Sequence, residues 1–181
     1  GWRELNRQVH DLVVLPVLEA MARRGHPYRG CLYVGAMVLE GQVQVLEFNA
    51  RFGDPETEVL LPMIEDPLPI LLQAAAGALD SPAPVLRAAA AVGVVAVREP
   101  YPGPVDPGGP VLGLAEAGAE GAVIFQMGTR SAPGGAVEVA GGRVLISTAT
   151  GPDLAHAREA AYQGMKMIRF AGMRFRHDIA A

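Results

Sequence analysis

The chain has 181 residues, of which 50% are hydrophobic, and its formal net charge at pH 7 is -4. This mild acidity argues against a general nucleic-acid binder, which needs clustered lysine and arginine to displace phosphate counterions. The longest apolar run, 88–97, is far shorter than the roughly 20 residues of a membrane helix, and the first residues do not form a signal peptide. We therefore expect a cytoplasmic protein without nucleic-acid or membrane partners.

An amphipathic helix is predicted over residues 3–24. Its apolar positions recur at helical spacing: Leu5, Val9, Leu12, Val13, Val17, Leu18 and Met21. Pro16 lies inside this segment and should bend or split the helix, because proline removes a backbone donor. Gly25 is the predicted stop signal.

Two β-rich runs, 31–39 and 42–49, follow and are separated by Glu40-Gly41. They predict a hairpin, since glycine supplies the positive φ that a tight turn needs. Asp54-Pro55 predicts a helix start, with Asp54 as N-cap and Pro55 at the first helical position, and this helix should run to about Met63. A second helix is predicted over 67–79.

The best linker in the chain is 80–84, which is rich in proline and small residues. We therefore expect two domains, 1–82 and 83–181. Beyond the linker, strand-like runs separated by Gly/Pro-rich turns occur at 90–97, 121–126, 136–139 and 143–148. A closing helix is predicted over 153–168, with one apolar face formed by Leu154, Ala157, Ala161, Met165 and Ile168. The pattern as a whole predicts an α+β fold.

The second strand of the hairpin ends in a pattern that could carry chemistry. Because strand side chains alternate, Glu47 and Asn49 should share one face, and Leu46 and Phe48 the other. A carboxylate and an amide carbonyl are oxygen ligands of the kind that Mg²⁺ requires, with water and nucleotide phosphates completing its shell. An ordinary polar outer face explains the same spacing equally well.

The residues just after this strand suit an anionic ligand. The guanidinium of Arg51 can bind phosphate oxygens bidentately, and Gly53-Asp54-Pro55 leads into a helix start that favours anions. Asp54 could instead consume the free amides as a plain N-cap. Arg143 begins a later strand, and we interpret it first as a structural salt link, with a ligand-facing role open.

The run from Glu47 to Thr57, EFNARFGDPET, is very similar to the signature of the phosphoribosylamine–glycine ligase family, also called glycinamide ribonucleotide synthetases. Further blocks resemble the same family in the same order along nearly the entire chain: 28–35, 101–103, 141–145, 157–162 and 176–179. The resemblance implies the second half of an ATP-grasp domain, an antiparallel sheet with helices, followed by a small β-rich carboxyl-terminal domain with a closing helix.

The family joins glycine to 5-phosphoribosylamine with ATP as co-substrate, through glycyl phosphate. Carried over by position, Glu47 and Asn49 would bind Mg²⁺ or Mn²⁺, and Arg51 would steady the transferring phosphoryl group. The set Gly53, Asp54 and Pro55 would shape the glycine and phosphoribosylamine pocket. Positioning and electrostatics would carry the rate, since no protein nucleophile is needed.

Some features depart from the pattern of the wider superfamily. The position facing Glu47 on the first strand is about Gly35, so a further metal carboxylate found in many ATP-grasp enzymes is absent, as expected for this family. Met37, on the same face, is a candidate adenine contact or a plain core residue. The family's amino-terminal half, with its glycine-rich ATP loop, should precede this chain, and we expect that half to be its partner.

Two other functions stay open on these residues. One is a different ATP-grasp carboxylate–amine ligase of purine synthesis, although Gly53-Asp54-Pro55-Glu56-Thr57 favours the glycine enzyme. The other is a non-catalytic binding or assembly module. We expect the isolated chain to be inactive as a ligase, whichever of these functions applies.

Overall fold

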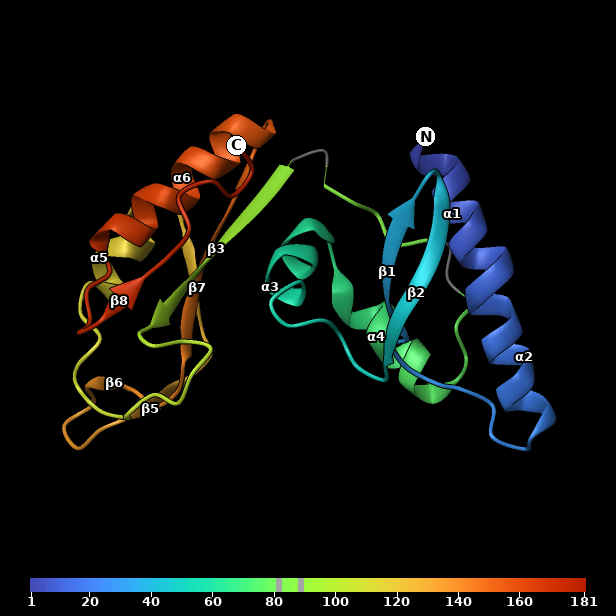
Figure 1. The fold of residues 1–181 in the computed structure, drawn as a ribbon, viewed down its shortest axis with the longest axis horizontal. Helices are drawn as coiled ribbons and strands as arrows, with labels where there is room; N and C mark the ends of the chain where they lie inside the picture. Colours follow the sequence, from blue (N-terminus) through green and yellow to red (C-terminus); the bar gives the residue numbers. More distant parts are fainter. Residues whose placement is uncertain (81–82, 88–89) are drawn as a thin grey trace. The chain divides into compact units, whose positions relative to one another are not determined.

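The structure is a computed structural model that describes residues 1–80, 83–87 and 90–181 (Figure 1). Helices and antiparallel strands are mixed along the chain, which confirms the predicted α+β class. Within the described residues, none of the helices combines the length and apolar character needed to cross a bilayer.

The chain forms two compact units that are interleaved in sequence. The first unit contains Gly1–Gly53 and Asp66–Pro84, and the second contains Asp54–Glu65 and Val85–Ala181. The segment just after the candidate metal strand therefore packs with the second unit. The predicted division into domains 1–82 and 83–181 stays a prediction, and residues 81–82 of the predicted linker lie outside the described residues.

The first unit opens with the predicted helix, divided into three parts. Helix α1 (Trp2–Val9) continues through a π-helical turn, η1 (His10–Val14), into α2 (Leu15–Arg23). The π turn ends at Val14, two residues before Pro16, whose missing N–H cannot complete the regular ladder. The predicted helix and the disturbance at its proline are both confirmed.

The hairpin of the first unit consists of β1 (Tyr33–Leu39) and β2 (Gln42–Asn49). Glu40 and Gly41 both have positive φ, 51° and 78°, so the predicted turn is confirmed. Helix α1 is tied to this turn by Gln8, whose amide donates to the Gly41 carbonyl at 3.2 Å and accepts from the Val43 amide at 3.2 Å. Figure 1 shows the helix alongside the hairpin.

The second predicted helix of this unit is shorter than expected. Helix α4 covers Pro67–Ala76 and ends at Gly77, which has a φ of 70°. Glycine in the left-handed region ends many helices, because it adopts this conformation without steric cost. The prediction that this helix continues to 79 is therefore wrong at its C-terminal end.

The second unit is built on an antiparallel sheet with the order β4-β7-β3-β8. Its strands are β3 (Ala90–Arg98), β4 (Val123–Gln126), β7 (Arg143–Gly151) and β8 (Met173–Arg174). A separate small hairpin pairs β5 (Thr129–Ser131) with β6 (Val137–Val139). The four predicted strands are confirmed, while β5 and β8 were not predicted.

Helix α6 (Leu154–Met167) covers one face of this sheet and packs on β7 and β3 (Figure 1). Its predicted apolar face is confirmed at the fully buried Ala157, Ala161, Met165 and Ile168, but Leu154 is 52% exposed. Strand β3 buries alternate residues against this core: Val92, Val94 and Ala96. A short helix that was not predicted, α5 (Leu114–Ala119), packs beside α6.

The other face of β3 meets the segment that precedes α4 in the chain. Helix α3 (Thr57–Leu60) and the 3-10 turn η2 (Leu61–Met63) lie against it. A Cβ on Gly93 would be 2.7 Å from Val59 Cγ2, so the glycine lets α3 approach closely. The odd-numbered residues of β3 therefore line the side of the sheet on which Asp54 and Pro55 enter the unit.

The N-cap residue of helix α6 is Asp153, whose titratable side chain contacts His156. Asp153 Oδ1 accepts from the His156 amide at 2.9 Å and lies 2.8 Å from His156 Nδ1. The backbone hydrogen bond, then the ring contact, hold the pKa of Asp153 below its usual value, and the Asp153 hydrogen bond raises the pKa of His156. We expect Asp153→Asn to lower the pKa of His156, measured by NMR titration of its ring resonances.

The sign of the pH effect on stability follows from these directions. The His156 contribution is complete below the ordinary histidine pKa and is lost as the pH rises through the raised one. The Asp153 contribution is lost as the pH falls through its lowered pKa. The matched change Glu120→Gln should leave the His156 titration in place, and an unchanged midpoint in Asp153→Asn would contradict the assigned cause.

Candidate active site

The two oxygen donors predicted to bind a metal lie together at the end of β2. Asn49 Nδ2 donates a 2.9 Å hydrogen bond to Glu47 Oε1, so both side chains project from the same face of the hairpin. Glu47 is exposed and Asn49 is half-buried. The bond does not use the second carboxylate oxygen or the amide carbonyl oxygen, which are the two atoms that a hard cation would need.

The first strand leaves room for the Glu47 side chain. Gly35 is the register partner of Glu47, and a Cβ on this glycine would be 2.9 Å from Glu47 Cγ. The facing position is therefore glycine, as the sequence predicts, and it contributes no carboxylate. Met37 lies two residues further along β1 on the same face and is 47% exposed. Its contact with adenine stays a prediction.

The donor chemistry of this pair fits a magnesium or manganese ion. Among the residues that the structure describes, no group of three or more His, Cys, Asp or Glu could hold a metal ion. Magnesium is usually held by one or two carboxylates, with substrate phosphates and water as its other ligands. Glu47 and Asn49 therefore suit an ion that arrives with a nucleotide rather than a permanently caged one.

Arg51 and Gly53 follow in the loop after β2. Arg51 is exposed, and its Nη1 donates to the Phe52 carbonyl at 2.8 Å. This bond takes one of the five N–H donors of the guanidinium group, which leaves the planar face of donors that phosphate recognition uses. Gly53 is buried and is the last residue of the first unit before the chain enters the second. The catalytic role of Arg51 and the substrate role of Gly53 stay predictions.

Asp54 and Pro55 do not form the helix start that the sequence predicts. Helix α3 begins at Thr57, its N-cap is Glu56, and this cap makes no side-chain hydrogen bond. Asp54 instead binds Arg143, whose Nη1 donates to the Asp54 carbonyl at 2.8 Å and whose Nη2 lies 3.1 Å from Asp54 Oδ2. The carboxylate is thus committed to a side chain 89 residues away and not to the helix.

Arg143 is the residue whose relation to the site was missed. The sequence indicates a salt link at this position, and that is confirmed, but not that its partner is Asp54 of the signature run. Both residues are partly exposed, so the link is not a buried ion pair. The two contacts fix the orientation of the Arg143 guanidinium group at Asp54, the residue that precedes Pro55. The only available signal was the placement of Arg143 at a strand start.

The chain matches the models of one family over most of its length. The model described as the ATP-grasp (A) domain of phosphoribosylglycinamide synthetase matches residues 2–57, and the model of its C domain matches residues 91–181. A phosphoribosylamine–glycine ligase of Streptomyces coelicolor is 45% identical over 96% of this chain, and one of Synechocystis is 43% identical over 95%. The chain spans 43% and 42% of these two relatives.

Solved structures give the same result for the fold. A phosphoribosylamine–glycine ligase of Thermotoga maritima matches 98% of this chain with a TM-score of 0.83 and 29% identity, and the chain covers 43% of it. An N5-carboxyaminoimidazole ribonucleotide synthetase of the same organism matches 91% with a TM-score of 0.59 and 19% identity, which is a likeness of fold alone. The sequence and the fold agree: this chain belongs to the phosphoribosylglycinamide synthetase family, of which it carries the end of the ATP-grasp domain and the C domain.

Proposed function

We propose that this chain is part of an enzyme that ligates glycine to 5-phosphoribosylamine in purine synthesis, at the expense of ATP. The observation that carries the proposal is the Glu47–Asn49 pair, joined by its 2.9 Å hydrogen bond on one hairpin face within a family signature. In the reaction, a glycine carboxylate oxygen attacks the γ-phosphorus of ATP and ADP leaves. The amine of phosphoribosylamine then attacks the carbonyl carbon of glycyl phosphate, and phosphate leaves.

The residues of the chain would divide this work among them. Glu47 and Asn49 would hold Mg²⁺ or Mn²⁺, which offsets the charge of the ATP phosphates when it is bound. Arg51 would steady the transferring phosphoryl group through its unused N–H donors. The chain segment Gly53-Asp54-Pro55 would shape the substrate pocket. None of these residues forms a covalent intermediate, so the rate would come from position and charge.

The chain would work together with the remaining part of the same enzyme in the cytoplasm. Its relatives are more than twice as long, and the ATP-grasp model matches only up to residue 57. This length difference is also the observation that favours the competing idea of a non-catalytic binding or assembly module. The two ideas differ in one measurable property, which is turnover after the remaining part is supplied.

The proposal is tested by measuring ADP formation with glycine, phosphoribosylamine, ATP and Mg²⁺. We expect the chain alone to give no turnover, and we expect turnover when the preceding part of the Streptomyces coelicolor relative is added or fused. Turnover by the chain alone would refute the predicted division of labour. No turnover from a folded fusion would support the non-catalytic module, and turnover with another amino-group acceptor would support a different ligase of this superfamily.

A further inference from the structure

The last residues of the chain, 175–181, form a tail that follows strand β8. Beyond Arg174, the end of that strand, the described part of the chain contains no further helix or strand. Two blocks that the sequence analysis singled out meet here, since 157–162 lies on α6 and 176–179 in the tail. A segment without regular structure of its own needs contacts with other elements to keep one position.

The tail contributes to the cavity that contains Pro55. This cavity has a volume of about 660 Å³, lies within the second unit and includes Phe175, Arg176 and Ile179 among its lining residues. Under the proposed function, Pro55 belongs to the segment that shapes the glycine and phosphoribosylamine pocket. The position of the tail therefore sets the shape of one wall of that pocket.

Arg158 holds the backbone of the tail from the second turn of α6. Its Nε donates to the Ile179 carbonyl at 2.9 Å, and its Nη2 donates to the His177 carbonyl at 3.0 Å. The two carbonyls belong to residues two apart, and the planar fork of one guanidinium group reaches both. A single side chain thus fixes the course of the backbone immediately after Arg176.

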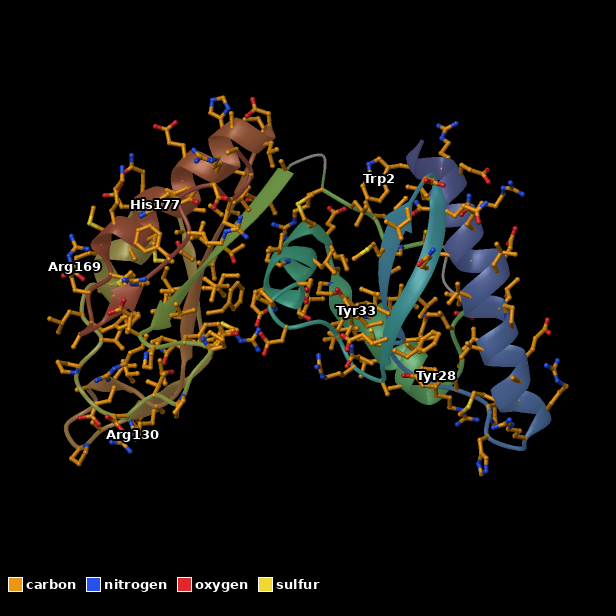
Figure 2. The ribbon with its side chains drawn as sticks, in the orientation of Figure 1. Trp2, Tyr28, Tyr33, Arg130, Arg169 and His177 are labelled. Carbon is orange, nitrogen blue, oxygen red and sulfur yellow. The ribbon has the colours of Figure 1, made fainter. Side chains whose placement is uncertain are left out.

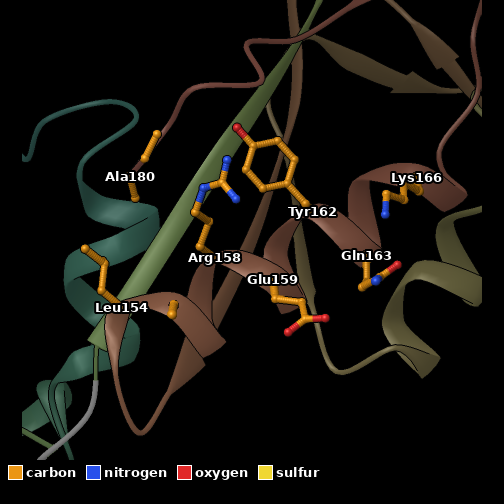
Figure 3. Close-up of a pocket in the computed structure, with 9 residues that line it drawn as sticks. Leu154, Arg158, Glu159, Tyr162, Gln163, Lys166 and Ala180 are labelled. Atoms are coloured by element: carbon orange, nitrogen blue, oxygen red, sulfur yellow. The ribbon is translucent and has the colours of Figure 1, made fainter.

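Tyr162, one turn further along α6, binds the tail from the same face of the helix. Its hydroxyl donates to the Arg176 carbonyl at 2.8 Å and accepts from the Ile179 amide at 3.2 Å. The centre of its ring lies 4.8 Å from the guanidinium carbon of Arg158 and 6.2 Å from the ring of Phe175. Figure 3 shows the two α6 side chains next to each other. The helix therefore holds the backbone on both sides of His177.

Arg158 and Tyr162 do not themselves reach the cavity. Among the described residues, those that line it do not include either of them. Both line a separate hollow of about 780 Å³ on the outer side of α6, together with Ala180 (Figure 3). The tail borders both spaces, because Ile179 lines the cavity and Ala180 lines the hollow. Contacts on the α6 side of the tail thus set the position of the side chains on its cavity side.

We propose that Arg158 and Tyr162 are positioning residues, which hold the tail so that its side chains form a fixed wall of the substrate pocket. The inference rests on the proposed function, because it concerns the same pocket. It gives a role in substrate binding to the blocks 157–162 and 176–179, which the proposed function does not use. The two residues act through the tail and touch no substrate.

The proposal is tested by steady-state kinetics of the fusion with the preceding part of the Streptomyces coelicolor relative. Arg158→Ala removes both carbonyl contacts, whereas Tyr162→Phe removes only the hydroxyl and keeps the ring. We expect each variant to raise the KM for glycine or for phosphoribosylamine about tenfold, because a binding wall is no longer held in place. The kcat and the KM for ATP should stay within about twofold, since the metal pair proposed for ATP lies in the first unit.

The matched control is Arg169→Ala. The guanidinium group of Arg169 also binds backbone carbonyls, those of Lys166 and Ile168, but these lie at the C-terminal end of α6 and not in the tail (Figure 2). Its substitution should leave every KM unchanged. A second readout needs no turnover: in the chain itself, the Ile179 amide should exchange about fivefold faster in Tyr162→Phe, which lacks its acceptor.

Each outcome decides the question. A raised KM in both variants but not in Arg169→Ala supports the proposal, and Tyr162→Phe serves alone if Arg158→Ala does not fold. A lower kcat with unchanged KM values is the result of fewer folded molecules, and it overturns the positioning role. Unchanged exchange of the Ile179 amide overturns it as well. Absence of turnover by the unsubstituted fusion refutes the ligase proposal and this inference together, whereas turnover with unchanged KM values in the variants refutes this inference alone.

Discussion

Glu47→Gln is expected to lower ATP-dependent turnover by about 10³-fold or more in a complete ligase that carries this chain. The substitution keeps the size of the side chain and its position over Gly35 but removes the negative charge that a divalent cation needs. The hydrogen bond from Asn49 can still form, because the glutamine carbonyl is also an acceptor. Since Glu47 is exposed, the free energy of unfolding should change by less than about 0.5 kcal/mol.

The matched control for this prediction is Glu40→Gln. Glu40 lies in the turn at the opposite end of the same hairpin, so the substitution makes the same change of charge away from Asn49. Turnover is measured as ADP release over a range of Mg²⁺ concentrations, and stability by urea unfolding followed by circular dichroism. Near-normal turnover in Glu47→Gln would show that the metal role is misplaced. Equal losses in both variants would indicate a general effect of charge.

The sequence predicted the hairpin and the shared face of Glu47 and Asn49 correctly, because both follow from local patterns. The Glu40-Gly41 turn sets the register as far as Ala36 opposite Val45, and a shift of register after Ala36 then places Gly35 opposite Glu47. The side chains of Glu47 and Asn49 lie together on one face. The strand period of two residues predicts the shared face of Glu47 and Asn49, but it does not predict the shift of register at Gly35. The helix with Pro16 is a similar case, since the loss of one backbone donor acts within a single turn.

The features that the sequence did not predict depend on residues that lie far away in the chain. Asp54-Pro55 has the residue types of a helix start, but Arg143 takes the carboxylate, and the helix begins at Thr57. The short strands β5 and β8 contain three and two residues, too few for a periodic signal, and they depend on their partners for formation. The cavity lined by Pro55, Arg143, Arg174 and Arg176 also depends on tertiary structure, because these residues lie far apart in the sequence.

Gly113→Ala is expected to destabilise the second unit by about 3 kcal/mol or more. Gly113 precedes α5 with a φ of 84°, and a Cβ there would be 1.9 Å from the Met167 carbonyl oxygen and 2.7 Å from its carbon. The clash is with backbone, so no rotamer change can relieve it. The chain would have to move away from α6 and strain the two hydrogen bonds between Leu112 and Arg169, at 2.9 and 3.1 Å.

Gly121→Ala is the control that separates the effect of the steric clash from the effect of placing alanine at a positive φ. Gly121 has nearly the same φ, 83°, but open space where its Cβ would be, so its substitution should cost only about 1 kcal/mol. Because the single tryptophan, Trp2, lies in the first unit, amide hydrogen exchange of β7 is the better readout. Equal losses for the two alanines would mean that the approach of Gly113 to Met167 is not tight. A larger loss for Gly113→Ala would show that the close approach of this turn to the end of α6 stabilises the second unit.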